Sequence, residues 1–505
     1  MASTMATAFA GLTLSSSAVE VCDLSRRHSS NLCSSSGTGS MRSTFFAKDC
    51  APRRSLCGAV VEPWKLSTTR GRAAARCHAV RGLERAEASR EVDDPDSLHQ
   101  FVIVGAGIAG LATAAAMNKI GVKTLVLEQS AGLRTTGASL TLWSNAWRVL
   151  DVLGIGDELR SQHQPITGIR FFNQEEKLLK TFDLEECPGG PHELCSVERK
   201  LLANALASQL PRDAIRLNSR VVSIERESNT GPFVLTLSDG CVLRTRVLLG
   251  ADGVNSVVGQ WMGLAKTRYV GQVGIRGVAV YPAGQPYGDK IRQFLGRGVR
   301  AGLAPISSTK VYWFMVYNRS SPGTKVTDPA EVRAELLSML DGWPQHMKEL
   351  LDNTPLENIS RAALADRWNL PGITAPVVQS GVTLAGDALH PMTPNLGQGG
   401  CCALEDAIIL AQTLGVVLAQ RAGGGDGDYD AITKAMEQYA AERQQRTFPL
   451  ALKSFVFGAL LQIGFAPVCF VRDNIAVPKI VRPSSFLSHT QYNCGQLPAS
   501  LVVRD

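Results

Sequence analysis

A glycine-rich turn between two apolar runs constrains the fold of this 505-residue chain more than any other feature. Residues 101–104 are wholly apolar, as expected of a central parallel strand. Then come Gly105, Gly107 and Gly110 in a GxGxxG pattern, and an alanine-rich helical pattern. The first glycine permits a tight turn, the second lets a pyrophosphate approach the backbone, and the third lets helix pack on strand. Glu128 ends the next apolar run, where a carboxylate can accept from ribose hydroxyls. The sequence therefore predicts a dinucleotide site, without distinguishing FAD from NAD.

The second constraint is the segment 382–414, which reads VTLAGDALHPMTPNLGQGGCCALEDAIILAQTL. Its strand-like start ends at Gly386 and Asp387, and a proline-containing loop follows. A helical pattern then begins at four residues, Gly397, Gln398, Gly399 and Gly400. A carboxylate can accept hydrogen bonds from two hydroxyls, while the N-terminus of a helix favours negative charge. This combination suits a polyol joined to a partly anionic ring, and a reduced flavin has both.

The third segment alternates as β-strands do from residue 221 to 249 and then reaches Asp252 and Gly253 in the sequence GADGVNS. Together, and in their order along the chain, the three segments resemble the three FAD fingerprints of single-component flavoprotein monooxygenases. That family includes para-hydroxybenzoate hydroxylase, salicylate hydroxylase and zeaxanthin epoxidase. The nearest likeness is to its plant chloroplast branch, related to zeaxanthin epoxidase and to urate- and salicylate-hydroxylase-like proteins.

The resemblance implies a role for individual residues. Asp387 would bind the ribityl chain of FAD, and the amides of residues 397–400 would lie at the pyrimidine edge of the flavin. Arg199, which opens a helical pattern, would pair with the pyrophosphate. Asp252 and Gly253 would serve both FAD and transiently bound NADPH or NADH. In the implied cycle, reduced FAD reacts with O2 to give a C4a-hydroperoxide, which inserts one oxygen atom into a small aromatic or isoprenoid substrate.

Two alternatives share this fold. A flavoprotein reductase of the geranylgeranyl-reductase type would need no O2. A non-catalytic flavin-binding protein is the other, and Gly259 favours it because many family members have arginine at that position. We single out no catalytic residue and expect no metal site, and we interpret His390 as shaping a loop. Four aromatic residues are candidates either for a substrate pocket or for strand core: Phe294, Trp313, Phe314 and Trp368.

The predicted fold class is α/β: a three-layer, Rossmann-like FAD-binding domain, an inserted mixed β-sheet substrate domain and a C-terminal helical segment. The expected boundaries are a transit peptide at 1–77, a linker at 78–100, FAD-binding parts at 101–165, 191–265 and 376–446, substrate-sheet strands at 166–190, a substrate domain at 266–375 and a C-terminal helical region at 447–505. Within these, the pattern predicts single helices over 331–352 and 429–446.

The formal net charge of +7 does not indicate a basic binding surface, because the excess lies in one N-terminal segment. Residues 1–82 contain eleven basic and four acidic residues, which accounts for the whole excess. Nucleic-acid binding is therefore not expected. The Ser-, Ala- and Arg-rich composition of residues 1–77 resembles a chloroplast transit peptide, and we expect cleavage near Cys77. Twelve cysteines show no metal-ligand spacing, so we expect free and mostly buried thiols in the mature protein.

An apolar stretch near the C-terminus leaves three interpretations open. Residues 454–471 contain no charged side chain, and their length barely reaches that of a membrane span. They could form a transmembrane helix, a helix lying on a membrane surface, or a helix covering the active site. Peripheral membrane association of a stromal protein is thus among the predictions, beside binding of a small-molecule substrate.

Overall fold

The computed structural model describes residues 97–133, 139–228, 231–324, 326–370, 373–420, 428–483 and 487–499. All of them fall within one compact unit, Ser89–Asp505. The predicted transit peptide, its cleavage site and most of the linker lie outside the described residues.

A parallel sheet forms the first half of the fold. Its strand order is β16-β17-β10-β1-β2-β7, and the five strands from β17 to β7 are parallel. Two further strands extend it, because β9 pairs with the first half of β10 and β8 pairs with β9. Its strands are β1 (Leu98–Val104), β2 (Leu125–Leu127), β7 (Ile215–Arg216), β8 (Val221–Arg226), β9 (Phe233–Leu237), β10 (Val242–Gly250), β16 (Val378–Gln379) and β17 (Val382–Leu384).

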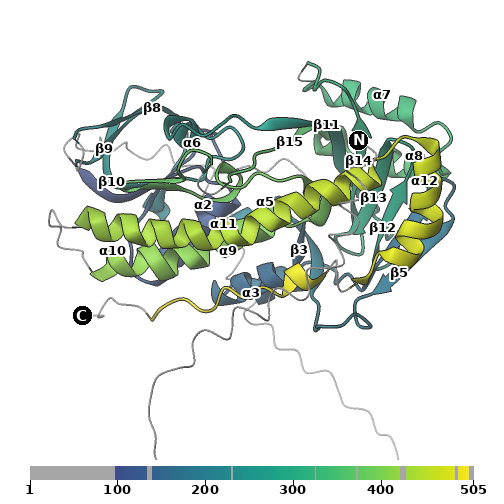
Figure 1. The fold of residues 1–505 in the computed structure, drawn as a ribbon, viewed down its shortest axis with the longest axis horizontal. Coiled ribbons are helices and arrows are strands. Elements are labelled where there is room, and N and C mark those ends of the chain that lie inside the picture. Colours follow the sequence, from purple (N-terminus) through teal and green to yellow (C-terminus); the bar gives the residue numbers. More distant parts are fainter. Residues whose placement is uncertain are drawn as a thin grey trace, which may run out of the picture. The chain divides into compact units, whose positions relative to one another are not determined.

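Helices cover this sheet and bury its apolar strands. Helix α2 packs on β1 and β2, while α5 and α9 pack on α2. The remaining helices around the sheet are shorter, apart from α11 (Asp428–Leu461), which runs beside α9 (Figure 1). These helices are α2 (Ile108–Lys119), α3 (Ser144–Val152), α4 (Gly156–Ser161), α5 (Arg199–Ala207), α6 (Val257–Trp261), α9 (Gly399–Leu410) and α10 (Val416–Gln420). A small antiparallel pair, β3 (Ser139–Trp143) and β6 (Leu194–Glu198), precedes α3 and α5.

The second half of the fold is a mixed seven-stranded sheet in the order β15-β11-β14-β13-β12-β4-β5. Only β12 and β4 pair in parallel. The strands are β4 (Gly168–Asn173), β5 (Leu178–Asp183), β11 (Arg268–Val280), β12 (Lys290–Leu295), β13 (Val299–Pro305), β14 (Lys310–Asn318) and β15 (Ser360–Asp366). The predicted α/β fold class, with a Rossmann-like part and a mixed sheet, is confirmed.

One face of the seven-stranded sheet packs against two helices, α7 (Pro329–Met339) and α8 (Gln345–Asp352), and encloses a core of its own. The prediction of a single helix over 331–352 is wrong. The chain turns at Gly342, which has a φ of +72°, and Pro344 directly precedes α8. Neither residue suits a helix interior, because Gly342 adopts a left-handed conformation and proline has no backbone N–H to donate to the preceding turn.

The C-terminal part also differs from expectation. Helix α11 (Asp428–Leu461) continues past residue 446 and through Pro449. The apolar stretch 454–471 is not one helix, because α11 ends within it and α12 (Ala466–Val471) follows at a bend of 107°. The helical segment Gly399–Gln420 is long and apolar enough to cross a membrane, but 83% of its most apolar window is buried inside the protein. The bent pair Tyr429–Leu461 and Ala466–Ile480 is long and apolar enough only if its two helices are counted as one span.

Candidate cofactor and substrate sites

The three sequence fingerprints meet at the carboxyl ends of the parallel strands. A Cβ atom on Gly105 would lie 2.6 Å from the carbonyl oxygen of Ala251, so the glycine turn and the Asp252 segment touch through backbone. One on Gly386, whose φ is +60°, would lie 2.8 Å from Cβ of Ala109. The Asp387 segment therefore packs on α2. Such contacts leave room only for glycine.

Gly107 and Gly110 differ in what surrounds them. A Cβ atom on Gly110 would lie 2.0 Å from the carbonyl oxygen of Gly105, so this glycine allows α2 to pack on the turn. On Gly107, the nearest atom would be the carbonyl oxygen of Ala251 at 3.9 Å. The open space beside Gly107, at the N-terminus of α2, is where a pyrophosphate could approach the backbone.

Two acids follow the strands on either side of β1, Glu128 after β2 and Asp252 after β10. Glu128 accepts hydrogen bonds from the backbone N–H of Ala106 at 2.9 Å and of Ser130 at 3.0 Å, which fixes its carboxylate beside the glycine turn. Asp252 accepts from the N–H of Val257 at 2.6 Å, while its Oδ1 is buried without a partner among the described residues. Burial raises the pKa of Asp252. The unpaired oxygen fits a ligand hydroxyl. The neighbouring Gly253 has a φ of +82° and open space around it.

Asp387 lies beside the N-terminus of α9. A Cβ atom on Gly399 would be 3.9 Å from its Oδ1. Its side chain is exposed to solvent, yet desolvation raises its pKa, opposed by the positive charges of His390 and Arg199. The carboxylate can be reached from solvent, as a group that receives a ligand must be. Arg199 is the first residue of α5. Its electrostatic effect on Asp387 places it on the same side of the fold.

The N-terminus of α9 presents backbone donors. No side chain caps this helix end, and its first turn contains no acid. The first N–H groups of a helix lack acceptors within it, so those of Gly399 and Gly400 are available to an anionic ring. Gly397 has a φ of +64°, which turns the chain into the helix. The side chain of Gln398 points instead into the core, where Oε1 accepts from Asn145 at 2.9 Å.

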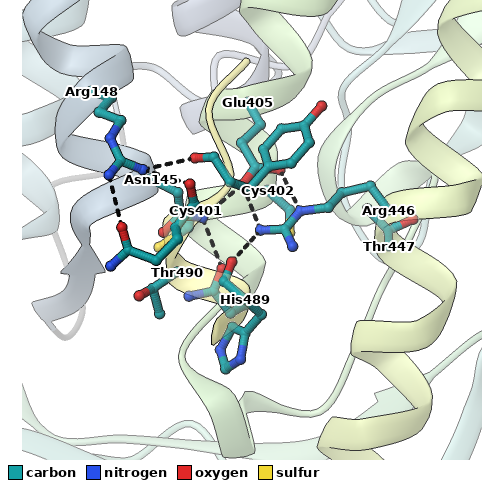
Figure 2. Close-up of polar contacts among 12 residues, drawn as sticks. Asn145, Arg148, Cys401, Cys402, Glu405, Arg446, Thr447, His489 and Thr490 are labelled. Carbon is teal, nitrogen blue, oxygen red and sulfur yellow. Dashed lines mark hydrogen bonds and ion pairs between the residues drawn. The ribbon is translucent and has the colours of Figure 1, made fainter. Parts of the chain in front are cut away.

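Behind α9 lies a buried set of charges that sequence reasoning missed. Glu405 accepts from Arg443 at 2.7 Å and from Arg446 at 3.0 Å, and Asp406 accepts from Arg443 at 2.6 Å. Asn145 donates to Glu405 at 2.6 Å (Figure 2). We name these five residues the α9–α11 charge network. Its members come from α3, α9 and α11, so no local motif indicates it.

The network also holds the loop of Asp387. Asp406 accepts from the N–H of Gly386 and from Nε2 of His390, each at 2.7 Å. Desolvation alone would raise the pKa of Asp406, but the charges of His390 and Arg443 outweigh it and lower that pKa to about 2. His390 thus anchors the loop after β17, as its loop-shaping interpretation expects. The carboxylate of Asp406 positions Asp387 without facing a ligand itself.

The face of the seven-stranded sheet opposite α7 and α8, which we name the inner face, bears Arg300, Tyr312 and Phe314. Arg300 is 3% exposed, and its guanidinium donates to the side-chain carbonyl of Asn395, in the loop before α9. No carboxylate pairs with it among the described residues, and its Nε is buried without a partner. Burial lowers the pKa of Arg300 to about 10, although Tyr312 opposes that shift. A buried guanidinium without a carboxylate has a positive charge that suits the binding of an anion.

The four aromatic candidates separate in the structure. Phe294 and Trp313 lie in the core against α7 and α8, so they are strand core. Phe314 is half-buried on the inner face, and the Arg300 guanidinium lies 5.8 Å from its ring centre. Trp368 lines a small pocket that includes His390. Trp368 also donates to Asp366, which pairs with Arg268 at 3.0 Å.

Comparison with known proteins matches this geometry. A family model described as an FAD binding domain matches residues 99–446. Monooxygenase 2 of Arabidopsis thaliana is 34% identical over 79% of this chain and 98% of its own length. The chloroplastic zeaxanthin epoxidase of Nicotiana plumbaginifolia is 28% identical over 75% of this chain and 58% of its own. The crystal structure of Klebsiella pneumoniae HpxO with FAD and uric acid has a TM-score of 0.62 and 24% identity, covering 78% of this chain and 93% of that one.

A Rossmann-like sheet with these fingerprints at its carboxyl edge defines an FAD-dependent oxidoreductase. The chain belongs to the FAD-binding-domain family of FAD-dependent monooxygenases.

The seven described cysteines are all free thiols, six of them buried. Among the described residues, no cluster of His, Cys, Asp or Glu could hold a metal ion.

Proposed function

We propose that this chain is an NAD(P)H-using monooxygenase that inserts one oxygen atom of O2 into a small aromatic or isoprenoid substrate. The second oxygen atom leaves as water, and the two electrons come from NADPH or NADH. The observation that carries the proposal is the meeting of three fingerprints beside Asp387 and the uncapped end of α9. FAD bound there would supply the redox chemistry, by the C4a route that the family resemblance implies.

The chain's own residues would hold the cofactor at both ends. The turn with Gly105, Gly107 and Gly110 fits the pyrophosphate, and Glu128 fits a ribose. Two observations support this: the open space beside Gly107 and the fixed carboxylate next to it. Arg199 would add a positive charge for the phosphates.

The flavin end would lie between two strand ends. Asp387 would accept from ribityl hydroxyls, and the backbone donors of residues 397–400 would face the anionic edge of the ring. Gly386 allows the close contact with α2, and Gln398 holds α9 through Asn145. The buried unpaired oxygen of Asp252 supports a contact with a sugar hydroxyl, beside Gly253.

The inner face of the large sheet would receive the substrate. Arg300 lies next to Asn395 in the loop before α9, and Phe314 lies beside it. The positive charge of Arg276, another inner-face residue, lowers the pKa of Asp387, which brings this face close to the flavin end. A guanidinium beside an aromatic ring suits a ring or chain with an acidic or phenolic oxygen.

The alternatives predict different products. A reductase would return a product without oxygen from O2, and a non-catalytic protein would hold FAD that NADPH never reduces. Gly259 is buried in α6, where its N–H donates to Ser256 at 2.8 Å. Because residue 259 is glycine and not the arginine of many family members, this position has no side chain that could contact NADPH. The experiment is to follow flavin bleaching by NADPH with plastid phenolics, isoprenoids and purines, and to trace ¹⁸O2. Unlabelled product would contradict the proposal.

Asp387→Ala tests the cofactor assignment. We expect FAD affinity to fall about 10- to 150-fold, because a hydrogen bond to a charged group contributes about 1.5–3 kcal/mol. The measurement is the ratio of flavin to protein absorbance after gel filtration. Glu175→Ala, an exposed acid on the β4–β5 turn, is the control and should retain FAD. A yellow, fully loaded Asp387→Ala protein would show that the assignment is wrong.

Location and domain boundaries follow as proposals. We infer import into the chloroplast from the composition of residues 1–77; the zeaxanthin epoxidase relative is itself named as chloroplastic. The FAD-binding parts would be 101–165, 191–265 and 376–446, and 166–190 with 266–375 would form the substrate domain. The mature N-terminus in isolated plastids would test the first proposal, since one still at Ala2 would contradict import with cleavage.

A further inference from the structure

Exposed apolar side chains concentrate in one short segment of the described structure. Of 17 large hydrophobic residues that are exposed, six lie within residues 465–480. The two phenylalanines among the 17, Phe465 and Phe470, are each 67% exposed. The six are Phe465, Val468, Phe470, Val471, Ile475 and Ile480, and we name them the α12 patch. Single exposed apolar residues are ordinary, but a concentration of them marks an interaction surface.

The segment is held so that this side faces outward. Cys469, Arg472 and Ala476 recur at helical spacing and are buried, whereas Val468, Val471 and Ile475 recur at the same spacing and are exposed. The guanidinium of Arg472 donates to the carbonyl oxygens of Gly296 and Leu461, each at 3.0 Å. The segment therefore cannot rotate to bury its apolar side without breaking these buried bonds.

Two further contacts fix the segment to the large sheet. Gln462, at the bend before α12, donates to the carbonyl oxygens of Gly298 at 2.8 Å and Val316 at 2.9 Å. Lys180 on β5 donates to Pro478 at 2.8 Å. In Figure 1, α12 lies beside β12 and β5 at the end of α11. The patch is thus a rigid projection at the edge of the substrate side.

The charges around the patch distinguish its partner. Between residues 448 and 482 the chain has four basic residues and one acid, Asp473. Asp473 pairs with Arg472 at 2.7 Å, so the local excess is positive and includes the exposed Lys479. Arg297 is exposed next to Gly298, whose N–H donates to Ile463 at the bend. Aromatic and aliphatic side chains flanked by basic residues match the interface of a bilayer that contains anionic lipids.

We propose that the α12 patch docks the protein on the surface of an anionic bilayer without spanning it. The bend of 107° and the bonds of Gln462 support surface docking over a straight span. Gly298, beside the bend, precedes β13 and is only two residues from Arg300 on the inner face. A docked enzyme would therefore hold its substrate side near the lipid, where isoprenoids dissolve. Docking does not depend on the proposed reaction.

The test is flotation of the full chain with vesicles of phosphatidylcholine and phosphatidylglycerol, against vesicles of phosphatidylcholine alone. The variant is Phe465→Ser with Phe470→Ser, and we expect it to lose binding at least about tenfold, since burying one phenylalanine contributes roughly 1.5–3 kcal/mol. The control is Leu356→Ser with Ile373→Ser, which removes exposed apolar residues outside the patch and should bind as the unchanged chain does. Residues 1–96 are the same in every variant, so any lipid binding by these residues contributes equally to each, and the difference between variants reports on the α12 patch.

A charge variant completes the test. Lys479→Gln should weaken binding to the anionic vesicles about fivefold, because one basic residue near such a surface contributes about 1 kcal/mol. It should leave binding to phosphatidylcholine unchanged. Equal flotation of the Phe465/Phe470 variant and the control would overturn the proposal. So would a self-associating protein that the same variant converts to monomers in light scattering without changing vesicle binding. FAD content is measured alongside, so that a failure of docking and a failure of the proposed oxidoreductase function remain separate.

Discussion

The cofactor side and the inner face of the large sheet are built by opposite means. Around the parallel strands, glycines bring backbone against backbone, and a missing Cβ decides what fits, as at Gly105, Gly110 and Gly386. On the inner face, long side chains from separate strands decide it, with Arg300 buried beside Phe314. On the proposed function, the first region would determine whether FAD binds at all, while the second would determine which substrate is accepted. Substitutions in the two regions should therefore fail in different ways.

The largest effect should come from the network behind the cofactor side. Arg443→Met leaves the buried carboxylates of Glu405 and Asp406 without their shared partner. Removing one member of a buried ion pair costs about 3–5 kcal/mol, so we expect a large fall in the free energy of unfolding, measured in urea. Arg446→Met is the matched control, because Glu405 keeps Arg443. Equal losses for the two variants would contradict the proposed importance of the shared arginine.

A glycine pair separates packing from ligand binding. Gly110→Ala should destabilise the fold by roughly 3 kcal/mol, because the new methyl group would meet backbone, which cannot move aside as a side chain can. Gly107→Ala should leave the melting temperature nearly unchanged but reduce FAD content, since only the space for a pyrophosphate is filled. Melting curves and flavin absorbance measure the two effects. If Gly107→Ala destabilised the fold as much as Gly110→Ala, the distinction would be lost.

Arg300→Met should affect the substrate and not the cofactor. FAD content should stay normal, while KM for an acidic or phenolic substrate rises about 10- to 150-fold, the effect of losing a charge-assisted hydrogen bond of about 1.5–3 kcal/mol. Steady-state kinetics with the best substrate from the screen would measure it. Arg297→Met, exposed in the turn three residues earlier, should leave KM unchanged. A loss of FAD in Arg300→Met with unchanged KM would reverse the assignment.

Acid should weaken the protein through the same network. The pKa of Asp406 is about 2 in the folded chain, below its ordinary value of about 3.9. Its stabilising contribution is therefore complete above pH 4 to 5 and is lost as the pH falls from there through 2. The raised pKa of Asp387 acts in the opposite direction and offsets part of this loss. Urea unfolding from pH 7 to 3 should show a shallower slope for Asp406→Asn than for the unchanged chain.

The sequence was enough to predict the family and the fold class, because each fingerprint is contiguous and each of its glycines has a backbone reason; the cofactor contacts of the individual residues stay predictions. It did not reveal Arg443 or Asn145, since the network joins three helices whose packing no local pattern determines. Arg300 was missed because a lone arginine in a strand gives no sign of which face it occupies. The break between α7 and α8 had a signal, Gly342 and Pro344, that helical periodicity alone overrode.

Helix α11 has a consequence for regulation. Its 34 residues extend about 50 Å at 1.5 Å per residue, and its middle holds Asp406 through Arg443. Its end leads into Gln462, which donates to Gly298, next to β13, and to Val316 on β14. Helix α11 thus joins the loop of Asp387 to the edge of the seven-stranded sheet. If FAD and substrate bind as proposed, FAD bound near one end of α11 should raise the affinity for substrate near the other end, and bound substrate should raise the affinity for FAD by the same factor. The FAD-free protein should therefore bind its substrate more weakly.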